Sequence, residues 1–413
     1  MREMKDSGIE WIGQIPKDWD VVPHKRVMHK VKKICEQYKG EDIISLTMNG
    51  VIKRDLTAGG KMPTSFDGYQ YVKPNDLLLC LFDIDVTPRC VGVVKDYGVT
   101  SPAYSRFVMH DGYYNAYYDY LLRAIDDDKV FVHLSKNLRS SLTESDFGAI
   151  KTCVPSLAEQ EHIAAFLDAG CAEIDAVLEK TRASIEEYKK LKQAVITQAV
   201  TKGIRGNRPM KDSGIEWIGE IPAEWGVVPH KRIMHKVKEI CEQYNGEDVI
   251  SLTVNGVVKR DLTAGGKMPT SFDGYQYVEP NDLLLCLFDI DVTPRCVGVV
   301  RDYGVTSPAY SRFVMHDGYY NAYYDYLLRM IDDNKVFVHL SKNLRSSLTE
   351  SDFGAIKTCA PPLAEQKCIA AFLDVRCDEI DALIAKKQQY LTEIENYKKS
   401  LIYEYVTGKK EVI

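Results

Sequence analysis

A long internal repeat constrains this chain more than any other feature of its sequence. The segment "KDSGIEWIGQIPKDWDVVPHKR" (Lys5–Arg26) returns as "KDSGIEWIGEIPAEWGVVPHKR" (Lys211–Arg232). Met4 aligns with Met210, a shift of 206 positions, and the alignment continues without a gap to the end of the chain. Solenoid repeats are only about 20–50 residues long. The chain is therefore a duplicated module, not a solenoid.

Each copy has a closely repeated first part and a diverged second part. Met4–Ala164 and Met210–Ala370 are roughly nine-tenths identical, whereas the rest of each copy shares little except a pattern. Apolar residues recur there at steps of three, four and seven, which is typical of a helix with a narrow apolar seam, as in a coiled coil. The seam residues are Ile174, Leu178, Ile185, Tyr188, Val195 and Ala199 in the first copy and Ile380, Ile384, Leu391, Ile394, Leu401 and Tyr405 in the second.

The two seams predict two long helices that pair with each other. No Pro or Gly interrupts Ala172–Thr201 or Asp378–Thr407, so we expect helices of about 45–50 Å. A lone helix would leave its apolar stripe in water, and each therefore needs a partner. Parallel pairing would require the loop "KGIRGNRPM" (Lys202–Met210) and the next "KDSGIEW" segment to travel back along a helix. We therefore expect antiparallel pairing, with the globules at opposite ends and related by a two-fold axis.

The globular part of each copy has strand and turn signals. "DIISLT", "QYVKPNDLLLCLF", "CVGVVKDYGVT" and "YSRFVMH" are rich in β-branched and aromatic residues and are bounded by Gly, Asn, Asp and Pro. One helix is expected at Asn115–Asp126, capped by Asn115, and Trp11 and Trp19 are expected to anchor an opening arm. The predicted fold class is α+β, with two globular domains separated by a pair of long helices in an antiparallel coiled coil and with internal pseudo-two-fold symmetry.

Composition and motifs argue against a membrane protein, a metal protein and an enzyme. The longest apolar stretch, Asp76–Val86, is too short to span a bilayer, and the N-terminus lacks the apolar core of a secretory signal, so we expect a cytoplasmic protein. The 11 cysteines are scattered without a CxxC pair, which indicates free buried thiols. "AGGKMPTS" (Ala58–Ser65) lacks parts of a phosphate loop, and no dinucleotide-binding or methyltransferase motif is present. We expect no catalytic site, metal or cofactor in this chain.

Polar and basic residues gather in loops of the globular part. Arg, Lys, Asn and Gln can read base edges, and Ser and Thr can contact phosphates. Any one of these residues could equally lie in a solvated loop, so the prediction rests on their clustering. The predicted DNA-binding residues are Asn49, Lys53, Arg54, Lys61, Thr64, Ser65, Arg89, Lys136, Asn137, Arg139 and Ser140, and in the second copy Asn255, Lys259, Arg260, Lys267, Thr270, Ser271, Arg295, Lys342, Asn343, Arg345 and Ser346.

Three duplicated motifs resemble the specificity subunits of type I restriction–modification systems. They are "KDSGIEWIGEIPAEW" ahead of the globule, "PPLAEQKCIAAFLD" (Pro361–Asp374) and "YVTGK" (Tyr405–Lys409). The first copy departs slightly, with Ser156 at the second proline of the motif and "VTKGI" in place of "VTGK". The resemblance covers essentially the whole chain. It implies target recognition domains at 1–155 and 206–361, a first conserved helix with its linker at 156–205, and a second at 362–413.

The resemblance also implies a function and partners. A specificity subunit neither cuts nor methylates; it binds a bipartite sequence in double-stranded DNA. It holds two adenine methyltransferase subunits, which use S-adenosylmethionine, and motor–nuclease subunits, which use ATP and Mg, join for restriction. Methyltransferase docking is expected at exposed side chains of the two "LAEQ" segments. These partner-binding residues are Glu159, Gln160, Glu365 and Gln366.

The near-identity of the copies predicts a symmetric target. Two equal domains related by a two-fold axis should read an inverted repeat, with half-sites about one helical turn or slightly more apart. The differences Lys73/Glu279 and Lys39/Asn245 are expected to change phosphate contacts in one half. Because the net charge is -6, the methyltransferases are expected to supply part of the phosphate contact.

Two alternatives remain open at this point. The chain could be a coiled-coil adaptor that does not bind DNA. It could also serve a related system in which one partner polypeptide both cuts and methylates.

Overall fold

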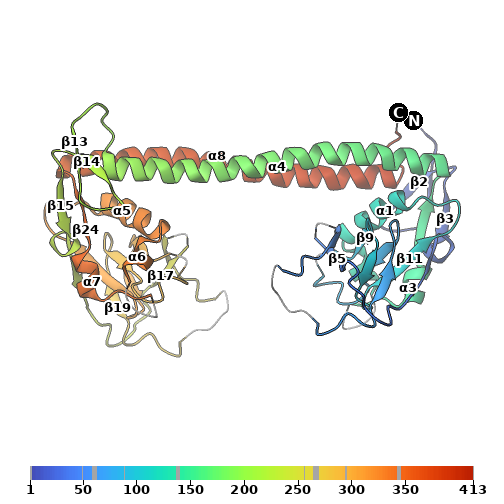
Figure 1. Ribbon diagram of the computed structural model, residues 1–413, viewed down its shortest axis with the longest axis horizontal. Helices are drawn as coiled ribbons and strands as arrows, with labels where there is room; N and C mark the ends of the chain where they lie inside the picture. The colour runs from blue at the N-terminus through green and yellow to red at the C-terminus, as the bar shows by residue number, and fades with distance from the viewer. Residues whose placement is uncertain are drawn as a thin grey trace. The chain divides into compact units, whose positions relative to one another are not determined.

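The chain forms two compact units. The computed structural model describes residues 2–48, 50–57, 63–87, 89–135, 140–254, 256–263, 269–293, 295–341 and 346–412. Unit 1 comprises Met1–Arg182 and Gln389–Ile413, and unit 2 comprises Ala183–Gln388. Each unit therefore contains one globular domain and a segment of each long helix (Figure 1).

The long helices are longer than the sequence pattern predicted. Helix α4 (Leu157–Lys202) has 46 residues and helix α8 (Leu363–Val406) has 44, so α4 is about 69 Å long. The expected 45–50 Å is therefore wrong, and the half-site spacing based on it loses its support. Gly170 lies inside α4, where a Cβ atom would lie 3.6 Å from Leu401 of α8. Because Gly170 has no side chain, α4 and α8 can approach each other closely at this point. The glycine does not end α4.

Within each unit the two helix segments pair in antiparallel orientation. Contacts between them are the ion pairs Asp175–Lys398 and Arg182–Glu395 in unit 1 and Lys192–Asp381 in unit 2, each with an N–O distance of 2.6 Å. Because residue numbers rise along α4 as they fall along α8, the segments run in opposite directions. Every predicted seam residue is buried or half-buried. The predicted antiparallel coiled coil is confirmed.

The globular domain of unit 1 is built around a four-stranded antiparallel sheet. Its strand order is β4 (Met28–Lys30), β11 (Ser105–Met109), β8 (Leu77–Leu79) and β9 (Val91–Val93), and Phe107 of β11 lies opposite both Lys30 and Leu77. Helix α1 (Asn115–Asp127) packs against this sheet in one hydrophobic core, which also includes Ile163 of α4 and Val406 of α8. Each globule is therefore anchored through its core to both long helices.

The same elements recur in both units. Unit 1 contains β1 (Met4–Asp6), β2 (Gln14–Pro16), β3 (Asp20–Pro23), η1 (His24–Arg26), β4 (Met28–Lys30), β5 (Ile44–Thr47), β6 (Gly50–Lys53), β7 (Gln70–Val72), β8 (Leu77–Leu79), β9 (Val91–Val93), β10 (Gly98–Thr100), β11 (Ser105–Met109), α1 (Asn115–Asp127), α2 (Val130–Leu134), α3 (Glu144–Ala149) and β12 (Lys151–Val154). Unit 2 contains β13 (Met210–Asp212), β14 (Glu220–Pro222), β15 (Gly226–Pro229), η2 (His230–Arg232), β16 (Met234–Val237), β17 (Val249–Thr253), β18 (Gly256–Lys259), β19 (Gln276–Val278), β20 (Leu283–Leu285), β21 (Val297–Val299), β22 (Gly304–Thr306), β23 (Ser311–Met315), α5 (Asn321–Asp333), α6 (Val336–Leu340), α7 (Glu350–Ala355) and β24 (Lys357–Ala360).

Single residues confirm some of the expectations from the sequence and contradict others. The arm prediction is confirmed, because Trp19 is buried in the core and Trp11 packs against it. The Asn115 cap is wrong: Tyr114 precedes α1 without a side-chain cap, and the Asn115 amide donates to the Asn75 carbonyl at 3.1 Å instead. All the cysteines are free and all but Cys368 are buried. Among the described residues, no helix is long and apolar enough to cross a membrane.

A glycine fixes the approach of the β5–β6 hairpin to strand β10. A Cβ atom at Gly98 would collide with the backbone carbonyl of Asp42 and lie 2.8 Å from Ile44. Replacement of Gly98 by alanine is therefore expected to lower the free energy of unfolding by about 1–3 kcal/mol, measured by urea denaturation. Gly206→Ala is the matched control, because Gly206 faces open space. Equal effects of the two substitutions would show that the hairpin yields to the added methyl group.

Candidate nucleic-acid interface and helix junction

The structure describes about half of the predicted DNA-binding residues. The others lie outside the described residues; they are Asn49, Lys61, Lys136, Asn137 and Arg139 in the first copy and Asn255, Lys267, Lys342, Asn343 and Arg345 in the second. The described ones are Lys53, Arg54, Thr64, Ser65, Arg89 and Ser140, with Lys259, Arg260, Thr270, Ser271, Arg295 and Ser346 as their counterparts.

Lys53 ends the β5–β6 hairpin and is already paired with acids. Its Nζ atom lies 2.9 Å from Asp42 and 3.6 Å from Asp96. The hydrogen bond to Asp42 and the two negative charges raise the pKa of Lys53. Lys259 of the second copy has the same two carboxylate neighbours, Asp248 and Asp302. A DNA phosphate would have to compete with these carboxylates for the ammonium group.

Arg89 brings the loop after β8 to the turn of the β5–β6 hairpin. Its Nε donates to the Met48 carbonyl at 3.1 Å, and a terminal nitrogen lies 3.8 Å from Asp127. A second contact joins this loop to the segment before α3, since the Ile84 N–H donates to the Ser140 carbonyl at 3.0 Å. Ser140 adopts a left-handed backbone conformation, with φ of 42°. Three of the predicted loops are therefore joined to one another by hydrogen bonds.

The same contacts recur in the second copy. Arg295 donates to the Val254 carbonyl at 3.3 Å, and Ile290 donates to the Ser346 carbonyl at 3.0 Å. The two copies thus present the described part of this loop cluster in the same arrangement.

The remaining described residues among those predicted to bind DNA are exposed. Thr64 and Ser65 are exposed, and the Ser65 hydroxyl accepts from the Asp67 N–H at 3.0 Å. Arg54 is exposed, and its backbone N–H donates to Ile43 at 2.8 Å. Their counterparts Thr270, Ser271 and Arg260 are also exposed.

The residues predicted to bind partners face inward, contrary to expectation. Gln160 and Gln366 are fully buried, and Glu365 is 7% exposed. Gln160 accepts from the Tyr114 N–H at 2.8 Å and donates to the Pro155 carbonyl at 2.9 Å, both with backbone groups. Such satisfied amides stabilise a buried helix start. The expectation that the polar side chains of "LAEQ" are exposed is wrong for Gln160, Glu365 and Gln366, while the Glu159 side chain is half-buried, at 22% exposed.

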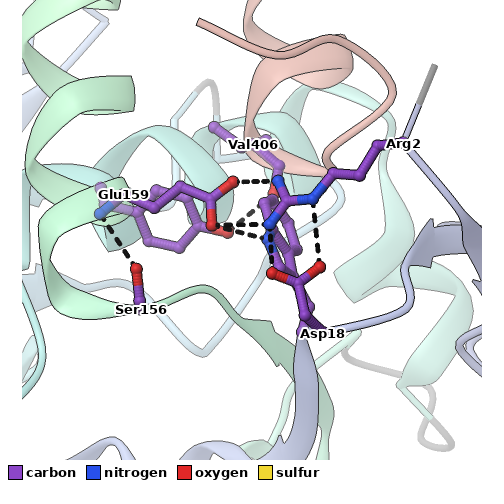
Figure 2. Close-up of polar contacts among 7 residues, drawn as sticks. Arg2, Asp18, Ser156, Glu159 and Val406 are labelled. Atoms are coloured by element: carbon purple, nitrogen blue, oxygen red, sulfur yellow. Dashed lines mark hydrogen bonds and ion pairs between the residues drawn. The ribbon is translucent and has the colours of Figure 1, made fainter.

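The first copy's glutamate belongs to an arginine-centred junction. Figure 2 shows Arg2 between the carboxylates of Glu159 and Asp18, with which it forms ion pairs. The hydrogen bond from Arg2 lowers the pKa of Asp18. The indole N–H of Trp19 donates to Glu159 at 3.0 Å. The N-terminal arm is thereby fixed to the first turn of α4.

The second junction is better shielded from solvent and also holds a helix end. Arg208 forms an ion pair of 2.6 Å with Glu365 and donates to the Lys202 carbonyl at 2.8 Å. Its side chain is 10% exposed and that of Glu365 is 8% exposed. The guanidinium also lies 5.2 Å from the ring of Trp225. Arg208 thus connects the last turn of α4 to the first turn of α8.

Each globule also binds the last turn of a helix through a buried tyrosine. The Tyr117 hydroxyl donates to the Val406 carbonyl of α8 at 2.8 Å. The Tyr323 hydroxyl donates to the Val200 carbonyl of α4 at 2.7 Å. Burial raises the pKa of both phenols well above its usual value, so they remain donors at neutral pH.

Sequence reasoning missed the arginines of these junctions. The alignment of the copies was started at Met4 and Met210, but Arg2 and Arg208 also align, each 157 positions before its glutamate partner. An arginine retained just outside the closely repeated block was the available signal. Its pairing with a glutamate so far along the chain needed the structure.

Comparisons with known proteins agree with the fold. No family model matches the chain. It is 24% identical over 435 residues to the putative type I restriction enzyme MjaX specificity subunit of Methanocaldococcus jannaschii, covering 97% of this chain and 96% of that protein. It is 26% identical over 288 residues to the type I restriction enzyme MjaVIII specificity subunit of the same organism, covering 64% of this chain and 63% of that protein.

A solved structure shares the architecture over nearly the full length. A chain from a structural study of complex assembly and conformational transition of the type I R-M system aligns with a TM-score of 0.71. The alignment covers 96% of this chain and 99% of that chain at 15% sequence identity. The α+β fold with paired long helices is therefore common to both, and the resemblance found in the sequence is confirmed.

Proposed function

We propose that this chain, which resembles type I restriction enzyme specificity subunits in sequence and in fold, is the DNA-recognition subunit of such a system. The observation that carries the proposal is the duplicated loop cluster. In both copies the β5–β6 turn, the loop after β8 and the segment before α3 meet through the same contacts, such as Arg89 with Met48 and Arg295 with Val254. Loops that converge on a rigid sheet are suited to binding.

The target that fits two near-identical domains is an inverted repeat. All the predicted DNA-binding residues are unchanged between the copies, so both domains would read the same bases. The intervening base pairs would be unread and constant in number. Sequence would be read at base edges, while Ser, Thr, Lys and Arg side chains would also contact phosphates.

The chain itself would be non-catalytic and would bind no cofactor. Two methyltransferase subunits would supply S-adenosylmethionine chemistry, and motor–nuclease subunits with ATP and Mg would join for restriction. Since the polar side chains of "LAEQ" are used internally, we assign methyltransferase docking to exposed apolar residues, namely the leucine of each "LAEQ" segment and a phenylalanine further along each helix. These are Leu157 and Phe166 on α4 and Leu363 and Phe372 on α8.

Selection from random duplex DNA tests the proposal. The chain, copurified with its methyltransferase, is expected to enrich an inverted repeat with one constant gap. Two unlike half-sites would mean that the few substitutions between the copies change base reading. Failure to enrich any sequence, with a stable complex still formed, would overturn the proposal in favour of a coiled-coil adaptor.

A further inference from the structure

The two domains differ in charge on one face although they agree in shape. We define the Tyr71 face of unit 1 as Lys33, Lys39, Tyr71, Lys73 and Tyr97. Its counterpart in unit 2, the Tyr277 face, consists of Glu239, Asn245, Tyr277, Glu279 and Tyr303. Three lysines on the first face thus correspond to two glutamates and an asparagine on the second. All six of these side chains are exposed.

Backbone contacts place the residues of the Tyr71 face together. The Tyr71 N–H donates to the Lys33 carbonyl at 2.8 Å, and the Lys33 ammonium lies 5.5 Å from the Tyr71 ring centre. Tyr97 stacks on Tyr71 with a centroid distance of 6.1 Å. Lys73 directly follows strand β7, two residues after Tyr71, and precedes Pro74. The residue before a proline is biased towards extended conformations, and alternation along an extended segment would place its side chain on the side of Tyr71.

Glu41 connects Lys39 to the same face. One carboxylate oxygen of Glu41 accepts from the Lys39 N–H at 2.8 Å. The other accepts from the Tyr71 hydroxyl at 3.2 Å. Lys39 is therefore joined through Glu41 to Tyr71, over whose ring the Lys33 ammonium lies.

The fold does not require these lysines. In unit 2 the Tyr277 N–H donates to the Glu239 carbonyl at the same 2.8 Å, and Tyr303 stacks on Tyr277 at 6.0 Å. Asn245 donates its N–H to Glu247 at 2.8 Å, as Lys39 does to Glu41. Because the geometry survives the reversal of charge, the lysines of unit 1 are available for an anionic partner.

The Tyr71 face borders the predicted DNA-reading residues. Lys53 is paired with Asp96, the neighbour of Tyr97. Tyr38, next to Lys39, donates its N–H to Asp67 at 2.8 Å, and Asp67 in turn bonds to Ser65. These contacts connect neighbours of Tyr97 and Lys39 to Lys53 and Ser65, two of the predicted DNA-binding residues.

We propose that the Tyr71 face binds phosphates of duplex DNA flanking the half-site read by the first domain, and that the Tyr277 face makes no such contact. The inference rests on the proposed function. Lysines bind phosphates without regard to base sequence and release counterions as they do so. The first domain would therefore bind its half of a symmetric DNA target more tightly than the second domain binds the other half. The complex on a symmetric target would be asymmetric.

Exchange of the charges between the copies tests this inference. The variant K33E/K39N/K73E gives unit 1 the residues of unit 2, and E239K/N245K/E279K does the reverse. Affinity of the chain with its methyltransferase is measured as a function of salt on two duplexes, one ending at the selected site and one extended by about one helical turn at each end. The melting temperature of each variant checks folding, and we expect it to remain unchanged.

The inference predicts how the salt dependence of DNA affinity changes in each variant. On the extended duplex, K33E/K39N/K73E should reduce the slope of log K against log salt by about 0.9 for each lost phosphate contact, up to about three contacts. The reverse variant should increase it, and on the short duplex neither should change it. An unchanged slope on the extended duplex overturns the inference.

Other outcomes separate this inference from the proposed function. If the wild-type complex selects a DNA site but its charge variants keep the wild-type slope, this inference alone is wrong. If the slope is unchanged and methyltransferase binding weakens, the face binds an acidic protein surface, which also contradicts the inference. If the wild-type complex selects no DNA, the proposed function fails first.

Discussion

Replacement of Arg208 by alanine is expected to lower the free energy of unfolding of unit 2 by about 3–5 kcal/mol. The substitution leaves Glu365, whose side chain is 8% exposed, without its cationic partner. It also removes the hydrogen bond to the Lys202 carbonyl and the contact with the ring of Trp225. Removing one partner of a buried ion pair costs more than removing an exposed pair, because a charge stays buried without compensation. Urea denaturation followed by circular dichroism would measure the change.

The first copy supplies the matched control. Arg2 makes the corresponding ion pair with Glu159, but the two side chains are 25% and 22% exposed. Water can solvate the carboxylate that Arg2→Ala leaves behind, so the cost should be about 1–2 kcal/mol. Arg208→Lys keeps the charge but has a single ammonium in place of the guanidinium, and should fall between the wild type and Arg208→Ala. Equal costs at the two junctions would contradict the role we give to burial.

Acidification is expected to destabilise both globules through two buried histidines. His24 and His230 are fully buried, and burial lowers the pKa of each from 6.5 to about 4. The unfolded chain therefore binds protons at these residues at higher pH than the folded chain does. The contribution of the two neutral histidines to the free energy of unfolding is fully present above pH 6.5. It falls as the pH is lowered from 6.5 to 4, and below pH 4 these two histidines cause little further change. The difference corresponds to about 3 kcal/mol for each histidine.

Unfolding measured at pH 7, 5.5 and 4 checks this window. Carboxylates also titrate near its lower end, so the informative quantity is the difference between the wild type and H24L/H230L. The double variant is expected to lose stability less steeply between pH 6.5 and 4, whatever its stability at pH 7. His24 packs against Phe147 and His230 against Phe353, and a leucine can occupy such an apolar site. Parallel pH profiles for the two proteins would show that these histidines do not control the acid sensitivity.

The sequence predicted the pairing of the long helices correctly but not their length. The seam that includes Leu178 and Leu401 predicted two paired helices, the short connection Lys202–Met210 predicted their antiparallel sense, and the structure confirms both. The length of the first helix was underestimated because it was taken from the Gly- and Pro-free run Ala172–Thr201, whereas α4 continues through Gly170 back to Leu157. Helix propensity cannot foresee that Leu401, from the other end of the chain, packs against this glycine.

The sequence also did not predict which polar side chains are buried where the long helices begin. "LAEQ" is recognisable as a motif, but charged and amide residues at a helix start are usually exposed. The sequence does not reveal that Gln160 is enclosed by Tyr114 and Pro155, or that Glu365 meets Arg208. Burial of a polar group depends on the partners that the fold brings to it, and these come from distant segments.

The sequence by itself determined the duplicated module, the α+β character of each copy and the paired helices, because repetition and apolar periodicity are local properties of the chain. It also contained the charge difference between Lys33, Lys39 and Lys73 and their counterparts. The tertiary structure decided that these three lysines share one face with Tyr71. It also decided that the predicted partner residues Glu159 and Gln160 bind within the chain itself. Which side chains share a surface or form an ion pair depends on contacts between segments that are far apart in the sequence. These contacts exist only in the folded chain, so the local pattern of the sequence does not reveal them.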